Sequence, residues 1–255
     1  MSGARVIFTE MNDECPGDFV EDLKESPKCD GAVVISCRDI SGKDMYCSDE
    51  AYDIIRDRLI ATGAPAKGIH YIDTGNYHYL SRIFTSFIDE RYDLVLFDHH
   101  TDMQQGAFGD MLSCGSWAGD LLERDENLNT LTVFGPPAFE IEGTEVSLEL
   151  SGKKIQGRRF FGKAYEEDIS EKDIPVYISF DKDILSESVF VTNWDQGDMT
   201  AEEMSEAIQK VTSDRKLLGA DICGGISLND HAWNEAAALK NKMIDIKLFE
   251  IFSEK

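Results

Sequence analysis

The chain has 255 residues, and its 49 acidic and 25 basic residues give a formal net charge of −24. That length suits one large α/β domain or two small ones, and 42% hydrophobic residues suffice for a sizeable core. The charge argues against a nucleic-acid or membrane partner, because no basic run is longer than a pair such as Arg158-Arg159.

No targeting or membrane-spanning segment is expected. No apolar stretch approaches the roughly 18–20 residues of a membrane span, and residues 1–10 lack the basic start and apolar core of a secretory signal. The six cysteines form no Cys-x-x-Cys pair, and a domain of this size needs no disulfides. We therefore expect a cytoplasmic protein with free thiols at Cys15, Cys29, Cys37, Cys47, Cys114 and Cys223.

Short apolar runs alternate with amphipathic stretches along the chain. In the N-terminal part they predict buried strands at 5–9 and 32–36, a helix at 48–60, a strand at 68–73 and helical periodicity over 80–88. Ser48 is the expected N-cap of the helix at 48–60, because its hydroxyl can accept from a free backbone N–H of the first turn.

The alternation continues to the C-terminus, where Thr200 and Glu203 form a capping-box pair. The elements predicted in chain order are a strand at 94–97, a helix at 117–122, a strand at 131–134, a hairpin or edge excursion at 146–161, a strand at 176–180, a helix at 200–211, a strand at 217–222, a helix at 232–243 and a strand at 248–252. Strands that alternate with helices predict a mostly parallel sheet covered on both faces.

Ligand sites in such sheets lie beyond the carboxyl ends of the strands, so the residues after each apolar run matter most. Three runs are followed by potential metal ligands: Gly75-Asn76-Tyr77-His78 after 68–73, Asp98-His99-His100-Thr101-Asp102 after 94–97, and Asp181-Lys182-Asp183 after 176–180. In an extended backbone, positions 98, 100 and 102 would point the same way.

Leaving His99 aside, these strand ends supply four aspartates and two histidines. Four converging carboxylates repel one another, and a bound metal is the natural compensation. Oxygen-rich ligation with two imidazoles fits Mn²⁺ best and leaves Zn²⁺, Fe²⁺ and Co²⁺ open. Six ligands exceed the need of one tetrahedral zinc and suit two ions bridged by carboxylates and a water.

The three motifs resemble those of the arginase/agmatinase/formiminoglutamase family, the ureohydrolases, in the same order and at similar spacing. Residues 98–102 resemble the family's Asp-Ala-His-x-Asp, residues 179–185 its Ser-x-Asp-x-Asp-x-x-Asp-Pro, and residues 75–78 its Gly-Gly-Asp/Asn-His. The resemblance spans about residues 70–245. It implies a single arginase-like domain over residues 1–255, in three α/β/α layers with a mostly parallel sheet of about eight strands.

The resemblance also implies the roles of the ligands. One ion would be held by His78, Asp98, Asp102 and Asp181, and the other by Asp98, His100, Asp181 and Asp183. Asp98 and Asp181 would bridge the two ions. Asp102 would also hydrogen-bond the bridging hydroxide and pass its proton to the leaving amine.

Several positions depart from the family's pattern, so this chain resembles a divergent member. Ser186-Glu187 follows where the family has Asp-Pro, and His99 replaces an alanine. Cys114 stands in the place of the proton-shuttling histidine, and Gly224 in that of the glutamate that grips the guanidinium. Without that carboxylate the charge-assisted recognition of a guanidinium is lost, so the substrate need not be a guanidino compound.

We therefore expect a hydrolase of a non-peptide C–N bond in a small linear amidine or amide, using a hydroxide that bridges two Mn²⁺ ions. A single-zinc, deacetylase-like amidohydrolase and a non-catalytic relative that binds metal and ligand remain alternatives. The candidate catalytic residues are Asp102 and Cys114, although Cys114 also suits a packing role. The sequence identifies no substrate-binding residue and leaves open whether the chain forms a homo-oligomer.

Other conspicuous residues have plainer interpretations. His99 is expected to pack behind the site or to hydrogen-bond a ligand. His70 and His231 fit structural or exposed positions, and Cys223 fits the core. Residues 157–163 match the spacing of a phosphate-binding loop, but Ala164 replaces the Mg²⁺-binding Ser or Thr, so we treat the match as chance.

Overall fold

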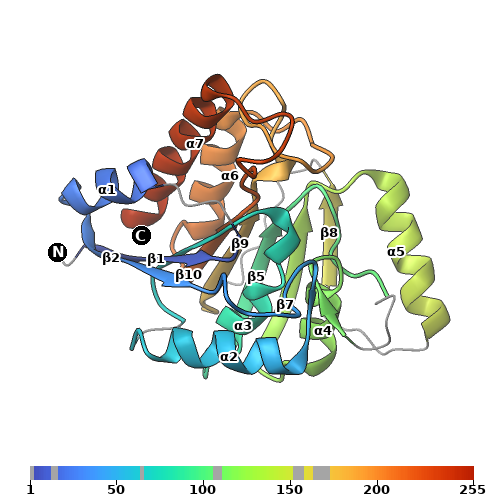
Figure 1. Cartoon of the computed structure of the whole chain (residues 1–255). Helices are drawn as coiled ribbons and strands as arrows, with labels where there is room; N and C mark the ends of the chain where they lie inside the picture. The colour runs from blue at the N-terminus through green and yellow to red at the C-terminus, as the bar shows by residue number, and fades with distance from the viewer. Residues whose placement is uncertain (1–2, 13–16, 64–65, 106–110, 152–157, 163–172) are drawn as a thin grey trace.

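The computed structural model describes residues 3–12, 17–63, 66–105, 111–151, 158–162 and 173–255. An eight-stranded, wholly parallel sheet in the order β2-β1-β4-β10-β9-β5-β7-β8 runs through the centre (Figure 1). This confirms the predicted sheet. Its strands are β1 (Ala4–Glu10), β2 (Cys29–Ser36), β4 (Ile69–Ile72), β5 (Tyr92–Phe97), β7 (Leu128–Phe134), β8 (Arg158–Gly162), β9 (Val176–Asp181) and β10 (Leu217–Cys223).

Helices cover both faces of the sheet and make the three layers (Figure 1). One face carries α1 (Gly17–Glu25), α6 (Ala201–Thr212) and α7 (Glu235–Ser253), and the other carries α2 (Asp49–Ile60), α3 (Leu80–Thr85) and α4 (Trp117–Arg124). Helix α5 (Ala138–Ser151) lies at the edge beside β8. A small antiparallel pair, β3 (Tyr46–Cys47) with β6 (Leu112–Ser113), and the 3-10 turns η1 (Gly75–Tyr77) and η2 (Lys182–Ile184) complete the described elements.

Two apolar cores, one on each face, hold the layers together. Successive side chains of β5 point to opposite faces of the sheet and so pack into different cores. Val95 and Phe97 belong to one core, whereas Leu94 and Leu96 belong to the other. Every residue of β5 and β9 is buried. The same is true of β4, so three strands that end at one edge of the sheet are held by packing along their whole length.

Local capping signals in the sequence are confirmed. The Ser48 side chain accepts a hydrogen bond from the N–H of Ala51 and begins α2. Thr200 and Glu203 form both hydrogen bonds of the capping box at the start of α6.

The strand predicted at 248–252 is wrong, because these residues form the last turns of α7. Leu248, Phe249, Ile251 and Phe252 are all buried in one core, at spacings that place them on one face of a helix. A short apolar run does not distinguish a strand from a buried helix segment by its period.

Of the hairpin or edge excursion predicted at 146–161, the hairpin is wrong, and the edge position is confirmed for β8. The first part of this range belongs to α5, and β8 pairs in parallel with β7 as an edge strand; residues 152–157 lie outside the described residues. Val146, Leu148 and Leu150 alternate as in a strand, yet only Leu148 is buried, with exposed fractions of 55%, 7% and 84%. Strand β2, predicted to be buried, is an exposed edge where Val34 is 42% accessible.

Two smaller findings bear on the expectations from composition. None of the described helices is both long enough and apolar enough to cross a membrane. Cys29, Cys37, Cys47, Cys114 and Cys223 are free thiols, and Cys15 lies outside the described residues.

The helical assignment of the C-terminus can be tested by two substitutions in α7. Leu248 is fully buried, so Leu248→Ala should lower the free energy of unfolding by about 2–5 kcal/mol through lost contacts and a cavity. Leu239 lies on the same helix and is 62% exposed, so Leu239→Ala should change the free energy of unfolding by less than about 0.5 kcal/mol. Urea denaturation measures both, and equal effects would contradict the burial pattern of α7.

Candidate metal centre

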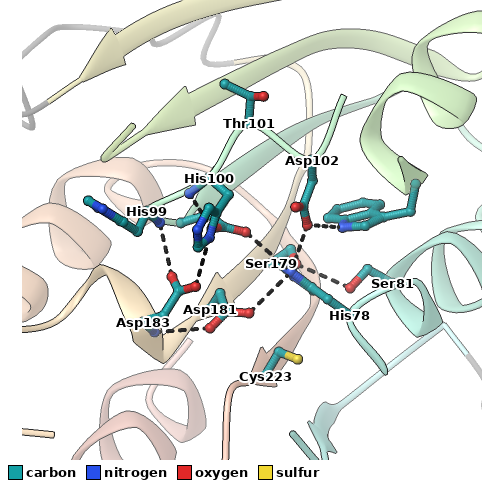
Figure 2. A network of polar contacts seen from close by, with 12 residues as sticks. His78, Ser81, His99, His100, Thr101, Asp102, Ser179, Asp181, Asp183 and Cys223 are labelled. Carbon is teal, nitrogen blue, oxygen red and sulfur yellow. Dashed lines mark hydrogen bonds and ion pairs between the residues drawn. The ribbon is translucent and has the colours of Figure 1, made fainter. Parts of the chain in front are cut away.

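The structure brings all six predicted ligands together at the carboxyl ends of three strands, and Figure 2 labels those other than Asp98. His78 follows β4 and η1, Asp98 follows β5 directly, and Asp181 ends β9. His100, Asp102 and Asp183 lie in the segments just beyond. The ligand side chains line a pocket of about 180 Å³.

His78 is the centre of a first cluster. Its Nδ1 atom lies 2.9 Å from Oδ2 of Asp102, 3.2 Å from Oδ2 of Asp98 and 3.3 Å from Oδ2 of Asp181. All four side chains are almost fully buried. This is the spacing expected of ligand atoms that share one ion.

His100 is the centre of a second cluster next to it. Its Nδ1 atom lies 2.9 Å from Oδ2 of Asp183 and 3.5 Å from Oδ1 of Asp98. Asp98 therefore faces one histidine with each of its oxygens. Potential ligand atoms of the set Asp98, His100 and Asp183 lie within 4.8 Å of one another, as do those of His78, Asp98 and Asp102.

Backbone hydrogen bonds hold three carboxylates in place. Oδ1 of Asp98 accepts from the N–H of His100 at 2.6 Å, and Oδ1 of Asp181 accepts from the N–H of Asp183 at 2.9 Å. Oδ1 of Asp183 accepts from the N–H of His99 at 3.0 Å (Figure 2). Each of these residues thus fixes one oxygen on a backbone N–H, local for Asp98 and Asp181 and from the segment after β5 for Asp183, and turns the other toward a histidine.

The fourth carboxylate, that of Asp102, is held differently. It accepts a hydrogen bond from the indole N–H of Trp117, which begins α4. Its backbone has a φ of 49°, an unusual left-handed conformation that aspartate tolerates better than most residues. The strained turn aims this side chain back at His78.

A chain of hydroxyl groups behind His78 sets its tautomer. Nε2 of His78 lies 2.9 Å from Oγ of Ser179, and that hydroxyl donates at 2.7 Å to Asp221. Ser81 donates to the same carboxylate oxygen at 2.9 Å. Since the Ser179 proton is used, Nε2–H of His78 must be the donor, and Nδ1 is the ring nitrogen that faces the three carboxylate oxygens.

Lone pairs facing carboxylates are repulsive unless a cation or a proton lies between them. Oδ2 of Asp98 is buried and has no hydrogen-bond partner among the described residues, although Nδ1 of His78 is 3.2 Å away. A divalent ion would resolve both features, and the donors present suit one: buried carboxylate oxygens and imidazole nitrogens.

The pKa values of the ligand residues are shifted in directions that would keep protons in the site when no metal is bound. Burial opposes charge on His78, but Asp102 and Asp98 outweigh it and raise its pKa well above the usual value. The same balance, with Asp183 and Asp98, raises the pKa of His100 to about 12. Burial and the neighbouring Asp98 charge raise the pKa of Asp102 to about 7.

Cys114 lies in the pocket wall, as expected if it took the place of a shuttling histidine. Burial, followed by the Asp102 carboxylate, raises the pKa of its thiol to about 12. A neutral thiol is a poor nucleophile and does not exchange protons readily near neutral pH. These properties favour the packing role over the catalytic one.

Gly224 is required by the centre itself. Its φ is +94°, and a Cβ added there would lie 2.4 Å from Oδ1 of Asp181 and 3.2 Å from the backbone nitrogen of Lys182. Any side chain at 224 would displace Asp181. The slot that resembles the guanidinium-binding position is therefore closed to a glutamate in this backbone.

The remaining histidines and Cys223 have plain environments. His99 stands against the His100 ring and supports Asp183 through its backbone, which agrees with a supporting role. His70 is fully buried against Phe84, and burial lowers its pKa to about 3, whereas the side chain of His231 is 96% exposed. Cys223 is fully buried, with its sulfur close enough to His78 and Asp181 to form a third potential ligand group.

Sequence reasoning missed the residues that position the ligands. Trp117, Ser179, Ser81 and Asp221 support the site, and Trp194 lines the pocket. Two of them carried a signal: Ser179 stands in the motif around Asp181, and Asp221 begins the segment that resembles the family's Asp-x-x-Glu and ends at Gly224. Of the loop-like stretch 157–163, the described part forms β8, and the rest lies outside the described residues.

Comparisons of the sequence with known proteins give limited information on the family. No family model matches the chain. An uncharacterized protein of Thermotoga maritima is 29% identical over 157 residues, 62% of this chain, and the match spans only 58% of that protein. Sequence comparison alone therefore leaves the family unassigned.

Solved structures are more informative. Helicobacter pylori arginase (TM-score 0.65, 13% identity) covers 97% of this chain and 99% of its own. Medicago truncatula arginase (TM-score 0.67, 12% identity) covers 99% of this chain and 86% of its own. Bacillus subtilis formimidoylglutamase (TM-score 0.63, 13% identity) covers 98% of this chain and 87% of its own. At these identities the likeness establishes the fold, and it agrees with the resemblance inferred from the motifs.

The pKa values generate a prediction about metal affinity. A metal ligand must lose its proton, so a proton on Asp102 below its pKa of about 7 competes with the ion. Mn²⁺ affinity should therefore rise by about tenfold per pH unit for this proton up to about pH 7, and the raised pKa values of His78 and His100 should extend the rise to pH 8. Titration calorimetry at several pH values measures the slope, and a flat profile would contradict the assignment of these three residues as ligands.

The glycine requirement generates a second prediction. Gly224→Ala should weaken Mn²⁺ binding by about 10–100-fold, because the new methyl group displaces Asp181. Gly31→Ala is the matched control: its φ is +121°, but a Cβ there meets nothing within 4 Å. Both variants carry backbone strain, so an equal loss of affinity in the two would attribute the effect to strain rather than to Asp181.

Proposed function

Because the chain has the arginase fold and gathers two imidazoles and four carboxylates at one edge of its sheet, we propose that it is a dinuclear metal hydrolase. It would cleave a non-peptide C–N bond in a small linear amidine or amide. The observation that carries this proposal is the position of His78 Nδ1, which lies within 3.3 Å of three buried carboxylate oxygens.

The geometry supports two adjacent ion sites. The first would be formed by His78, Asp98, Asp102 and Asp181, and the second by Asp98, His100, Asp181 and Asp183. Asp98 supports a bridging role because its two oxygens face different histidines. The predominance of carboxylate ligands favours Mn²⁺, with Zn²⁺, Fe²⁺ and Co²⁺ as the other candidates.

Two such ions would supply an acidified water and polarise the electrophilic carbon. Asp102 is the residue placed to move the proton, since it lies on the pocket wall and Trp117 fixes its carboxylate. In the overall reaction the water oxygen bonds to the carbon and the C–N bond breaks. The nitrogen leaves as an amine or ammonia that carries the proton passed on by Asp102.

The second candidate is a protein that binds metal and a ligand without turnover. The neutral thiol of Cys114 and the closed slot at Gly224 favour it, because neither position supplies a charged group. A single-zinc, deacetylase-like enzyme fits less well, since one ion would leave part of the carboxylate cluster uncompensated.

The decisive variant is Asp181→Ala, which removes a carboxylate facing His78. Metal analysis should find about two Mn²⁺ per chain in the parent, and the variant should lose most of that metal together with its Mn²⁺-dependent rise in melting temperature. Hydrolysis should fall by about 100-fold or more. Asp53→Ala, on the exposed face of α2, should change none of these quantities.

The outcomes separate the candidates. Unchanged metal content in Asp181→Ala would show that the site is assigned wrongly, and about one Zn²⁺ per chain would favour the deacetylase-like enzyme. A panel of guanidino, amidino, formimino and amide compounds tests activity in the presence of Mn²⁺. Full metal loading without turnover of any compound would favour the non-catalytic candidate.

A further inference from the structure

The face of the sheet that carries α1 and α7 has a second pocket, with a volume of about 620 Å³. None of its described lining residues is shared with the metal pocket. Lys182 lines the second pocket, whereas its neighbours Asp181 and Asp183 line the metal pocket, so the two cavities lie on opposite sides of this segment. Sites for small organic molecules have volumes of roughly 300–1,000 Å³. The second pocket is therefore large enough to bind a molecule of its own.

The floor of the second pocket is aromatic and is formed before any ligand binds. Tyr71 of β4 stacks on Phe8 of β1 with 5.0 Å between the ring centroids, and it meets Phe19 of α1 edge-on at 5.1 Å. The Tyr71 hydroxyl donates a hydrogen bond to the backbone carbonyl of Asp245 at 2.8 Å. The three rings are thus fixed by one another and by α7.

Exposed apolar side chains gather in the same lining. Leu228, Trp233 and Leu239 all line the pocket and are exposed to solvent. The wall formed by α7 is held in place, because the side chain of Asn241 exchanges hydrogen bonds of 2.9 and 2.7 Å with the backbone of Val191. Single exposed apolar residues are ordinary, whereas a group of them around a cavity indicates that an apolar ligand covers them.

Asp245 supplies an unused acceptor in this lining. Its Oδ1 accepts a hydrogen bond from Nζ of Lys182 at 2.7 Å. Its Oδ2 accepts none from a described residue and is not fully buried, and the side chain keeps an exposed fraction of 12%. Because Asp245 lines the pocket, this oxygen is available to a hydrogen-bond donor on a ligand.

The charges of the described lining favour a cation over an anion. Its two lysines already have carboxylate partners, Lys182 in Asp245 at 2.7 Å and Lys242 in Asp22 at 2.6 Å. The acids of the lining outnumber them and are Asp73, Glu235 and Asp245. Aromatic rings also attract cations through their faces. An ammonium group therefore suits this pocket better than a carboxylate or a phosphate.

We propose that the second pocket binds a small amphipathic amine. Its aromatic body packs on the floor formed by Phe8, Phe19 and Tyr71, and its ammonium group donates a hydrogen bond to Asp245. This ligand is distinct from the substrate of the metal centre, so the inference goes beyond the proposed hydrolase function and does not depend on it.

Three probes that share an indole ring test the chemistry of the site by titration calorimetry on the full chain. Tryptamine ends in an ammonium group, tryptophol in a hydroxyl group and indole-3-acetate in a carboxylate. Tryptamine should bind saturably at one site per chain and about tenfold more tightly than tryptophol, because a charge-assisted hydrogen bond is stronger than a neutral one. Indole-3-acetate should bind more weakly than tryptophol.

Two substitutions in α7 locate the binding site. Ala238 lines the pocket, so Ala238→Trp fills it without removing a charge and should weaken tryptamine binding by at least tenfold. Ala236 is exposed on the same helix and is not part of the described lining, so Ala236→Trp should bind tryptamine as the parent does. Circular dichroism checks that both variants are folded.

A third variant tests the role of the carboxylate. Asp245→Asn keeps an acceptor for Lys182 but removes the charge, so the tenfold preference for tryptamine over tryptophol should disappear. This variant leaves the buried Lys182 without a carboxylate and can lower stability, and Ala238→Trp supplies the test that does not depend on it.

Three results would each overturn the inference: no saturable binding of tryptamine, equal affinity for the three probes, or undiminished tryptamine binding by folded Ala238→Trp. The metal content of the parent, measured on the same sample, bears on the proposed function and not on this pocket. Failure of the one is thereby distinguished from failure of the other.

Discussion

The structure depends on one electrostatic constraint, the gathering of four buried carboxylates around two imidazoles. His78 has its Nδ1 atom directed at three of them, because Ser179 and Asp221 hold its other nitrogen as the donor. Such an arrangement is unfavourable unless protons or cations compensate it. The surrounding fold must therefore supply enough stability to keep the cluster assembled, and the strands that precede the ligands, β4, β5 and β9, are buried along their whole length.

The strands next to β9 and β5 also make room for the carboxylate cluster. In the sheet, β10 lies beside β9 and β7 lies beside β5, and each of these outer strands is followed by a glycine with positive φ. A Cβ at Gly224 would meet the carboxylate of Asp181, and one at Gly135 would lie 2.1 Å from the carbonyl oxygen of Asp98. Both aspartates are the proposed bridging ligands. The missing side chains on the flanking strands thus make room for the two residues on which both ion sites depend.

The ligands could be predicted from the sequence because a parallel sheet brings the carboxyl ends of its strands to one edge, whatever their separation along the chain. Their supporting residues could not, since Trp117 and Ser81 reach the site through packing that no local pattern encodes, and the motif that contains Asp221 did not indicate its contact with Ser179. The same limit explains the errors in the fold. Val146, Leu148 and Leu150 alternate like a strand but lie on α5, and the apolar run at 248–252 ends α7, because burial on a helix is decided by its neighbours in space.

Only a small part of the chain's negative charge belongs to the candidate metal centre. Of the 49 acidic residues, four converge on the pocket, and two divalent ions would leave them with no net charge. A protonated guanidine or amidine entering it would lose its hydration without gaining a carboxylate partner from the described lining, and burying an unpaired cation is costly. A neutral carbonyl group pays a smaller desolvation cost. The closed slot at Gly224 and the lack of a further carboxylate in the described lining would therefore both disfavour a cationic group at the metal centre.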